Sequence, residues 1–129
     1  MTDKAIYIHH FSVMAPTEII EATMRFYRDA LGIAPGYRPE FSLPGYWLYS
    51  GSHPLIHLTA KEDREQSGGR FFHHIALRCA NYSEVIYRLK NMNIEYRRLS
   101  ANEVKETQIT VIDPAGNLVE LNFENLENA

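Results

Sequence analysis

The sequence predicts an α+β fold in which two paired β-α-β-β-β modules form a cup-shaped mixed sheet with the helices outside. The first observation is an internal repeat: Tyr7–Val13 resembles Phe71–Leu77, and Pro54–Ala60 resembles Asn117–Phe123. The second is that all four segments are rich in apolar, aromatic and β-branched residues, which is typical of strands. The third is a stretch with helical periodicity between the paired strands of each half.

The helical stretches have recognisable ends. In the first half, apolar residues at helical spacing follow Thr17, an expected N-cap, and stop at Gly32. In the second half, Ser83 is the expected cap of a helix that runs to Met92. Two further strands are expected after each helix, at Tyr37–Phe41 and Tyr46–Ser50 in the first half and at Ile94–Leu99 and Gln108–Ile112 in the second.

A single domain covering residues 1–129 fits both the length and the 45% hydrophobic content. The modules are expected at about residues 5–61 and 70–124, joined by a polar linker at about 61–70 that contains Gly68 and Gly69. Each module alone is a poor independent folder because it is too small to bury enough surface. The two modules should therefore share one structure.

The composition excludes several classes of protein. The net charge is −3 and Lys and Arg do not cluster, so no nucleic-acid partner is expected. No apolar run has the length needed to cross a membrane, and the N-terminus lacks the pattern of a secretion signal. Cys79 is the single cysteine, which rules out an intramolecular disulfide. A cytoplasmic location is expected.

Candidate metal ligands follow from the alternation of side chains along the repeated strands. In the first strand of each half, His10 and His74 lie on the face opposite to the bulky apolar residues that should pack against the helix. Their neighbours His9 and His73 belong to the helix-facing side. His10 and His74 should therefore point into the cup.

The last strands of the two halves repeat this arrangement with a different pair of residues. His57 and Glu120 occupy matching places, each flanked by apolar residues that face the other way. A pseudo-two-fold relation between the modules would bring them together with His10 and His74. Three imidazoles and one carboxylate suit a borderline divalent metal such as Zn, Ni, Mn or Fe(II).

The alternative for these four residues is a structural role without a metal. A single histidine in a strand is usually a hydrogen-bonded polar residue, but unpaired buried polar groups are costly, and four ionisable residues at repeat-matched positions favour a metal site. His53 lies beside Pro54 and is expected to be solvated in a turn. Cys79 falls on the apolar face and is expected to be a buried small hydrophobe.

These residues resemble the vicinal oxygen chelate superfamily, which includes glyoxalase I, methylmalonyl-CoA epimerase, fosfomycin-resistance thiol transferases, extradiol dioxygenases and bleomycin-binding proteins. The resemblance covers nearly the whole chain. Together the Phe-Tyr-x-x-x-Leu-Gly and Asp-Pro-x-Gly-Asn-x-x-Glu patterns are fairly specific for the family, although neither is specific for one activity. The matching segments are residues 8–11, 26–32, 56–58, 74–77 and 113–121.

The resemblance implies a cup with a metal held by the first and last strands of each module. Carried over by position, the ligands are His10, His57, His74 and Glu120. Glyoxalase I enzymes usually have glutamate where this chain has His57, which argues against a standard glyoxalase I reaction. Extradiol dioxygenases and fosfomycin enzymes use two histidines and the final glutamate, a set that is present here.

The sequence leaves three functions open. We favour a metal-dependent lyase or isomerase acting on a small oxygen-chelating substrate, with Glu120 as the candidate general base. An Fe(II) extradiol ring-cleaving dioxygenase is the first alternative, in which Trp47 and Tyr49 would stack an aromatic substrate. A drug-binding or resistance module without catalysis is the second.

Arg78 is on the predicted face of His74 and is a candidate for binding a substrate anion. The family also implies a homodimer, while the sequence leaves open whether modules pair within or between chains.

Overall fold

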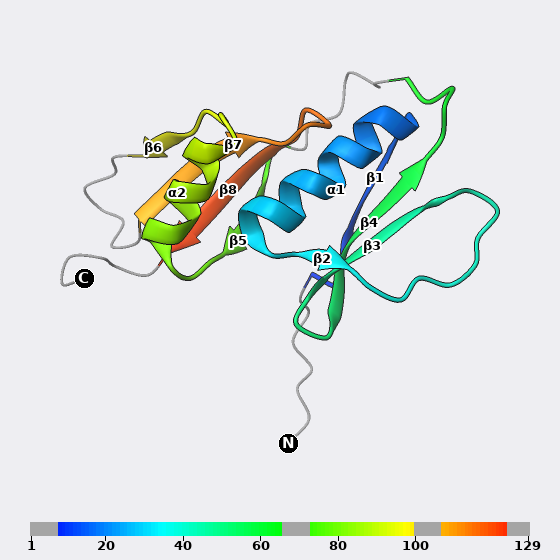
Figure 1. Ribbon diagram of the computed structural model, residues 1–129, viewed down its shortest axis with the longest axis horizontal. Coiled ribbons are helices and arrows are strands. Elements are labelled where there is room, and N and C mark those ends of the chain that lie inside the picture. Colours follow the sequence, from blue (N-terminus) through cyan, green and yellow to red (C-terminus); the bar gives the residue numbers. More distant parts are fainter. Residues whose placement is uncertain (1–7, 66–72, 100–106, 124–129) are drawn as a thin grey trace.

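The computed structural model describes residues 8–65, 73–99 and 107–123 and shows two modules of the same topology (Figure 1). The first module contains β1 (Phe11–Ala15), α1 (Thr17–Leu31), β2 (Ala34–Pro35), β3 (Gly45–Ser50) and β4 (His53–Ala60). The second contains β5 (Ile75–Arg78), α2 (Tyr82–Asn91), β6 (Arg97–Leu99), β7 (Thr107–Ile112) and β8 (Leu118–Phe123). The predicted repeat is thus confirmed, while residues 66–70 of the expected linker lie outside the described residues.

Each module forms its own four-stranded mixed sheet. The strand orders are β1-β4-β3-β2 and β5-β8-β7-β6. In both sheets the first strand is parallel to the last strand of its module, and the remaining neighbours are antiparallel. The two helices lie on the same side of the pair of sheets and contact each other (Figure 1). The fold class is α+β, as the sequence predicts.

Helix boundaries agree with the prediction at one end and differ at the other. Gly32 ends α1 in the left-handed conformation, at φ 73°, where its N–H bonds back to the carbonyl of Arg28. The expected N-caps are wrong, because Thr17 is already the first helical residue and Pro16 is the cap. Likewise α2 begins one residue before Ser83 and is preceded by Asn81. Neither helix has a side-chain hydrogen bond at its cap, so the capping residues gave no reliable signal.

The strand expected at Tyr37–Phe41 is absent from the structure. The sheet instead takes up Ala34–Pro35 as its edge strand, and the last ladder-like contact is the N–H of Gly36 donating to the carbonyl of Trp47. Beyond that point Pro39 removes a backbone donor, and side chains hold the segment as a loop. Arg38 donates to the carbonyl of Leu43, which closes this loop without strand pairing.

Alternation along the central strands is confirmed. In β4, Ile56, Leu58 and Ala60 are buried, and His57 lies on the other face. In β8 the apolar residues at 119, 121 and 123 are buried in the same way, and Glu120 lies on the other face. The helices cover the apolar faces, so the ionisable residues are left on the face without helices.

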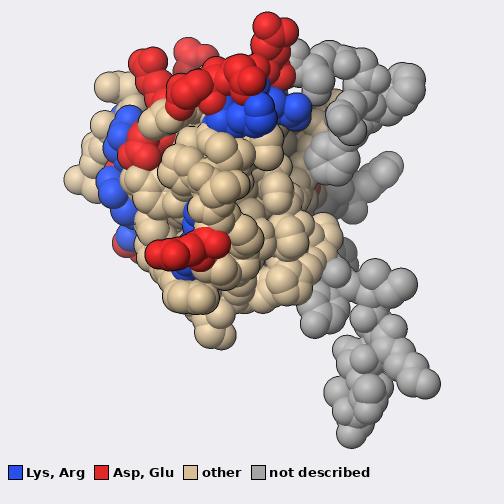
Figure 2. Space-filling model, turned by 90° about the vertical axis from the view of Figure 1, so that its right-hand side faces the viewer, with Lys and Arg blue, Asp and Glu red and all other residues tan. Residues whose placement is uncertain are grey.

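Charged side chains of both signs lie at the end of the molecule that holds the first module. Figure 2 shows acidic side chains gathered along its upper edge with basic ones beneath them, basic ones at its left edge, and a small mixed group on an otherwise uncharged face. No described helix combines the length and the apolar character needed to span a membrane.

Candidate metal and substrate site

The first half of the candidate site begins where the chain enters β1. His9 and His10 precede the strand and are both exposed, so the expected placement of His9 toward the helix is wrong. Their Nδ1 atoms lie 2.9 Å apart with the rings in an edge-to-face arrangement. Such a contact requires one ring to donate and the other to accept, which fixes the tautomers relative to each other. The Nε2 atom of His10 is left to act as a ligand when His10 is the donor.

His57 is held between two other rings in this first half. Its ring stacks on His10 at a centroid distance of 3.8 Å and on Trp47 at 4.1 Å, both at 10°. Its Nε2 atom lies 3.1 Å from the carbonyl oxygen of Pro54. Burial, followed by the nearby imidazole of His10, lowers the pKa of His57 below its ordinary value. A neutral imidazole is the ligating form, and its Nδ1 atom is the one not engaged with Pro54.

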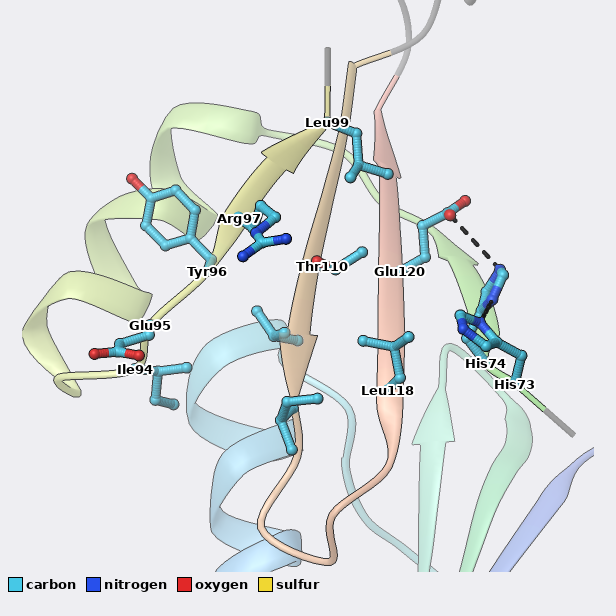
Figure 3. Close-up of a pocket in the computed structure, with 12 residues that line it drawn as sticks. His73, His74, Ile94, Glu95, Tyr96, Arg97, Leu99, Thr110, Leu118 and Glu120 are labelled. Carbon is cyan, nitrogen blue, oxygen red and sulfur yellow. Dashed lines mark hydrogen bonds and ion pairs between the residues drawn. The ribbon is translucent and has the colours of Figure 1, made fainter. Parts of the chain in front are cut away.

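The second half of the site repeats the paired histidines and adds a carboxylate (Figure 3). The Nδ1 atoms of His73 and His74 are 2.9 Å apart, the same spacing as in the first module, and their rings are again edge to face. The Nε2 atom of His74 lies 3.6 Å from Oε1 of Glu120. The Glu120 side chain is 15% exposed and that of His74 is 39% exposed, so the pair is open to a bound ion or molecule on one side.

Within the described residues the four predicted ligands form two pairs and do not gather into one cluster. His10 lies against His57, and His74 lies against Glu120. No set of three or more His, Cys, Asp or Glu side chains in the described ranges is close enough to hold a metal ion. Each pair therefore offers two possible donors, imidazole nitrogens in the first pair and an imidazole nitrogen with a carboxylate oxygen in the second, and these are donor types that borderline divalent metals take.

A pocket of about 890 Å³ covers the second pair. His74 and Glu120 lie at one side of it, and β6 and β7 form the rest of its floor (Figure 3). A smaller pocket of about 270 Å³ lies over the first half, where Trp47, His57 and Arg38 line it. Both pockets are on the faces of the sheets that the helices leave open.

The other residues singled out from the sequence have different places. Trp47 is stacked on His57, but the Tyr49 hydroxyl donates to the carbonyl of Tyr37, and a register shift separates Tyr49 from Leu48. Arg78 lines a different pocket, of about 460 Å³, together with Cys79. The structure therefore places Trp47 in the site region and does not bring Tyr49 or Arg78 to either ligand pair.

His53 and two arginines were not recognised correctly from the sequence. His53 is the first residue of β4, where it stacks edge to face on His9 at 4.6 Å, so its expected place in a solvated turn is wrong. Arg38 and Arg97 line the two pockets. Arg38 lay in a segment expected to be a strand, and Arg97 is in a short basic run whose alternation would have pointed to the open face.

The two modules of the same topology define a fold of the vicinal oxygen chelate type. A family model described as the Glyoxalase/Bleomycin resistance protein/Dioxygenase superfamily matches residues 7–121. The chain belongs to this superfamily.

Individual relatives agree with this assignment. The chain is 29% identical over 122 residues to Glyoxylase I 4 of Arabidopsis thaliana. The match covers 88% of this chain and 68% of that protein. A glyoxalase family protein from Bacillus anthracis has a similar structure, with a TM-score of 0.73, 24% identity, and coverage of 96% of this chain and 99% of that one. A glutamate-to-glutamine mutant of the fosfomycin resistance protein FosX from Listeria monocytogenes, complexed with Mn(II) and 1S,2S-dihydroxypropylphosphonic acid, gives a TM-score of 0.69 at 16% identity, with coverage of 98% of this chain and 96% of that one.

Proposed function

We propose that this protein is a metal-dependent lyase or isomerase that acts on a small substrate binding through adjacent oxygens. The observation that carries the proposal is the His74–Glu120 pair, with Nε2 and Oε1 3.6 Å apart at the edge of an 890 Å³ pocket. The His10–His57 pair at the repeat-equivalent positions supports it. The complex of FosX with Mn(II) and a dihydroxypropylphosphonic acid supports it further, because that compound carries two adjacent hydroxyl groups.

The proposed ligands are His10, His57, His74 and Glu120, and a divalent ion bound by them would supply Lewis-acid stabilisation of negative charge on a substrate oxygen. Glu120 is the one carboxylate of this set, and its position at the pocket suits it to accept a proton from a substrate carbon. His73 holds the ring of His74, and Trp47 holds that of His57. Zn, Ni, Mn and Fe(II) are all compatible with these donors.

We further propose that the site is completed in a homodimer, with the first module of one chain facing the second module of its partner. Within the described residues each chain provides two donors on each of two separate open faces, which is too few for a stable site on either face. Exposed apolar side chains adjoin both halves, Phe41 in the first and Leu99 and Ile112 in the second. Joining the two faces would bury these side chains while bringing the donor pairs together.

The metal ligands are tested with thermal melts of wild type and Glu120→Gln, each with chelator and with added Mn²⁺. We expect Mn²⁺ to raise the melting temperature of wild type more than that of the variant, because glutamine lacks the charge and can offer only one weaker oxygen. Glu84→Gln, an exposed acid paired with Arg88 on α2, is the matched control and should respond as wild type does. Equal stabilisation of wild type and Glu120→Gln would remove Glu120 from the ligand set.

The arrangement of the modules is tested by complementation. His10→Ala and His74→Ala should each be empty of metal when prepared alone. Refolded together in equal amounts, they should recover about a quarter of the wild-type metal content, because half of the dimers would be mixed and each mixed dimer would have one intact site of two. A mixture that stays empty would show that each site is built within one chain.

The class of reaction is tested separately. Exchange of a substrate C–H for deuterium in D₂O, followed by NMR with α-hydroxycarbonyl compounds, is expected for the lyase or isomerase and should be lost in Glu120→Gln. Oxygen uptake with catechols would instead indicate the ring-cleaving alternative. The geometry gives that alternative no particular support, since one face of Trp47 is covered by His57 and Tyr49 is bonded to a loop.

A further inference from the structure

Three residues of the second sheet form a row across the floor of the 890 Å³ pocket. Arg97 of β6 is directly opposite Thr110 of β7, and Thr110 is directly opposite Glu120 of β8. Directly opposed residues in antiparallel strands project from the same face of the sheet. All three line the pocket, so Arg97 and Glu120 stand at its two sides with Thr110 between them (Figure 3).

The neighbouring arginine shows that the placement of Arg97 depends on strand register. Arg98 lies on the opposite face of β6, where its guanidinium sits 5.7 Å from the ring centroid of Tyr82 in α2. Arg97 therefore projects from the open face of the sheet, while Arg98 packs against the helix on the other face.

The charge of Arg97 is not neutralised within the part of the chain that the structure describes. No ion pair or hydrogen bond links Arg97 to another described residue. Glu120, two strands away, contacts His74 instead. Glu95 also lines the pocket, but Figure 3 shows its carboxylate directed away from the Arg97 guanidinium. A guanidinium with its donors turned toward a partly enclosed pocket is well suited to bind an oxyanion.

We propose that Arg97 binds an anionic group of the substrate, so that the substrate class is a short chelating compound with a carboxylate, phosphonate or phosphate at its far end. The inference rests on the proposed function, which places the chelating oxygens near His74 and Glu120. Two strand spacings separate Glu120 from Arg97, roughly 10 Å at the backbone. After the side chains are counted, a spacer of about two to four atoms fits between the two ends of such a molecule. Leu99 and Leu118 line the same pocket and would contact this spacer.

The test compares two probes that share one chelating group. Lactate has the 2-hydroxy acid alone, whereas 2-hydroxyglutarate adds a second carboxylate at the end of a short chain. With Mn²⁺-loaded protein, calorimetry should show 2-hydroxyglutarate binding at least about tenfold more tightly than lactate, as expected for one charge-assisted hydrogen-bonded pair. Arg97→Met should reduce this preference to within about twofold and leave lactate affinity unchanged, and Arg97→Lys should keep part of it.

Arg98→Met is the matched control, with the same loss of charge one residue away, and it should keep the full preference. The proposal would be overturned if wild type showed no preference for 2-hydroxyglutarate over lactate, or if Arg97→Met kept that preference. Equal loss of the preference in Arg97→Met and Arg98→Met would also overturn it. If wild type binds no Mn²⁺, the proposed function fails, and Arg97 is then judged with metal-free protein and glutarate. A selective NMR shift of the Arg97 Nε–H on adding glutarate would uphold the anion site, and no shift would reject it.

Discussion

The hydroxyl of Tyr27, in α1 of the first module, donates a hydrogen bond of 2.8 Å to Oδ2 of Asp113, at the turn between β7 and β8 of the second. Both residues are buried, with exposures of 0% and 2%. Asp113 also accepts from the backbone N–H groups of Ala115 and Asn117 and from the Asn117 side chain. One carboxylate thus closes the turn that leads into the strand of Glu120 and joins it to the other module.

Removing this hydroxyl should destabilise the whole fold. Burial, and then the charge of Asp113, raise the pKa of Tyr27 far above its ordinary value, so it remains a donor throughout the accessible pH range. We expect Tyr27→Phe to lower the free energy of unfolding by about 1–3 kcal/mol, because a buried carboxylate loses a donor. Tyr46→Phe removes the hydroxyl that donates to Glu21 at a partly exposed site, and it should lower the free energy of unfolding by less. Urea denaturation measures both, and equal effects would contradict a special role for the Tyr27 bond.

The histidine pairs should separate ligands from residues that orient them. His10→Ala and His74→Ala should each abolish tight metal binding. His9→Ala and His73→Ala should preserve the stoichiometry and weaken affinity about 10–100-fold, because they remove the Nδ1 contact that fixes the neighbouring ring. Competition with a metallochromic chelator gives the affinities. A site emptied by loss of His9 but retained without His10 would mean that the roles of the two are exchanged.

His57 should make the metal-free protein sensitive to acid. Its pKa is lowered by burial first and by His10 second, so the unfolded chain takes up a proton at a higher pH than the folded chain does. The stability that neutral His57 contributes is therefore present above its ordinary pKa of 6.5 and is lost as the pH falls below it. Urea melts of chelated wild type and His57→Gln from pH 8 to about pH 5 should show wild type losing more stability than the variant. A difference independent of pH would show that His57 titrates normally in the fold.

Cys79 should be a slow nucleophile in the folded protein. Burial raises the pKa of its thiol from 9.0 to about 11, with Arg78 opposing this only in part. At pH 8 the thiolate fraction falls about 100-fold relative to an unperturbed thiol, and alkylation by iodoacetamide should slow at least as much. The urea-unfolded protein is the reference, and comparable rates in the two states would show that the thiol is accessible and unperturbed.

Much of the fold could be predicted because one alternation rule operates along the repeated strands, but His10 and His74 precede β1 and β5 and are not placed by that rule. Ile56 and Leu58 had to face the helices, and this placed His57 on the open side; Glu120 follows from the same rule. The segment Tyr37–Phe41 could not be predicted in this way, because its shape depends on contacts such as that between Arg38 and Leu43, which are made by loop closure. Within the described residues the four predicted ligands form two separate pairs, and local pattern could not reveal this separation, because it depends on how the folded modules are placed relative to each other.

The repeat also has a meaning for metal selectivity. The two modules present matching histidine pairs, and in the proposed site their donor sets differ at one place, where the first has an imidazole at His57 and the second a carboxylate at Glu120. In that proposed site, this one difference would set the chemical hardness of the donor set. His57→Glu would change the proposed donor set from three nitrogens and one oxygen to two nitrogens and two oxygens. The metal preference of the site should then shift from nickel and zinc toward manganese. A single substitution in one of the two modules would then be enough to change which ion the whole protein selects.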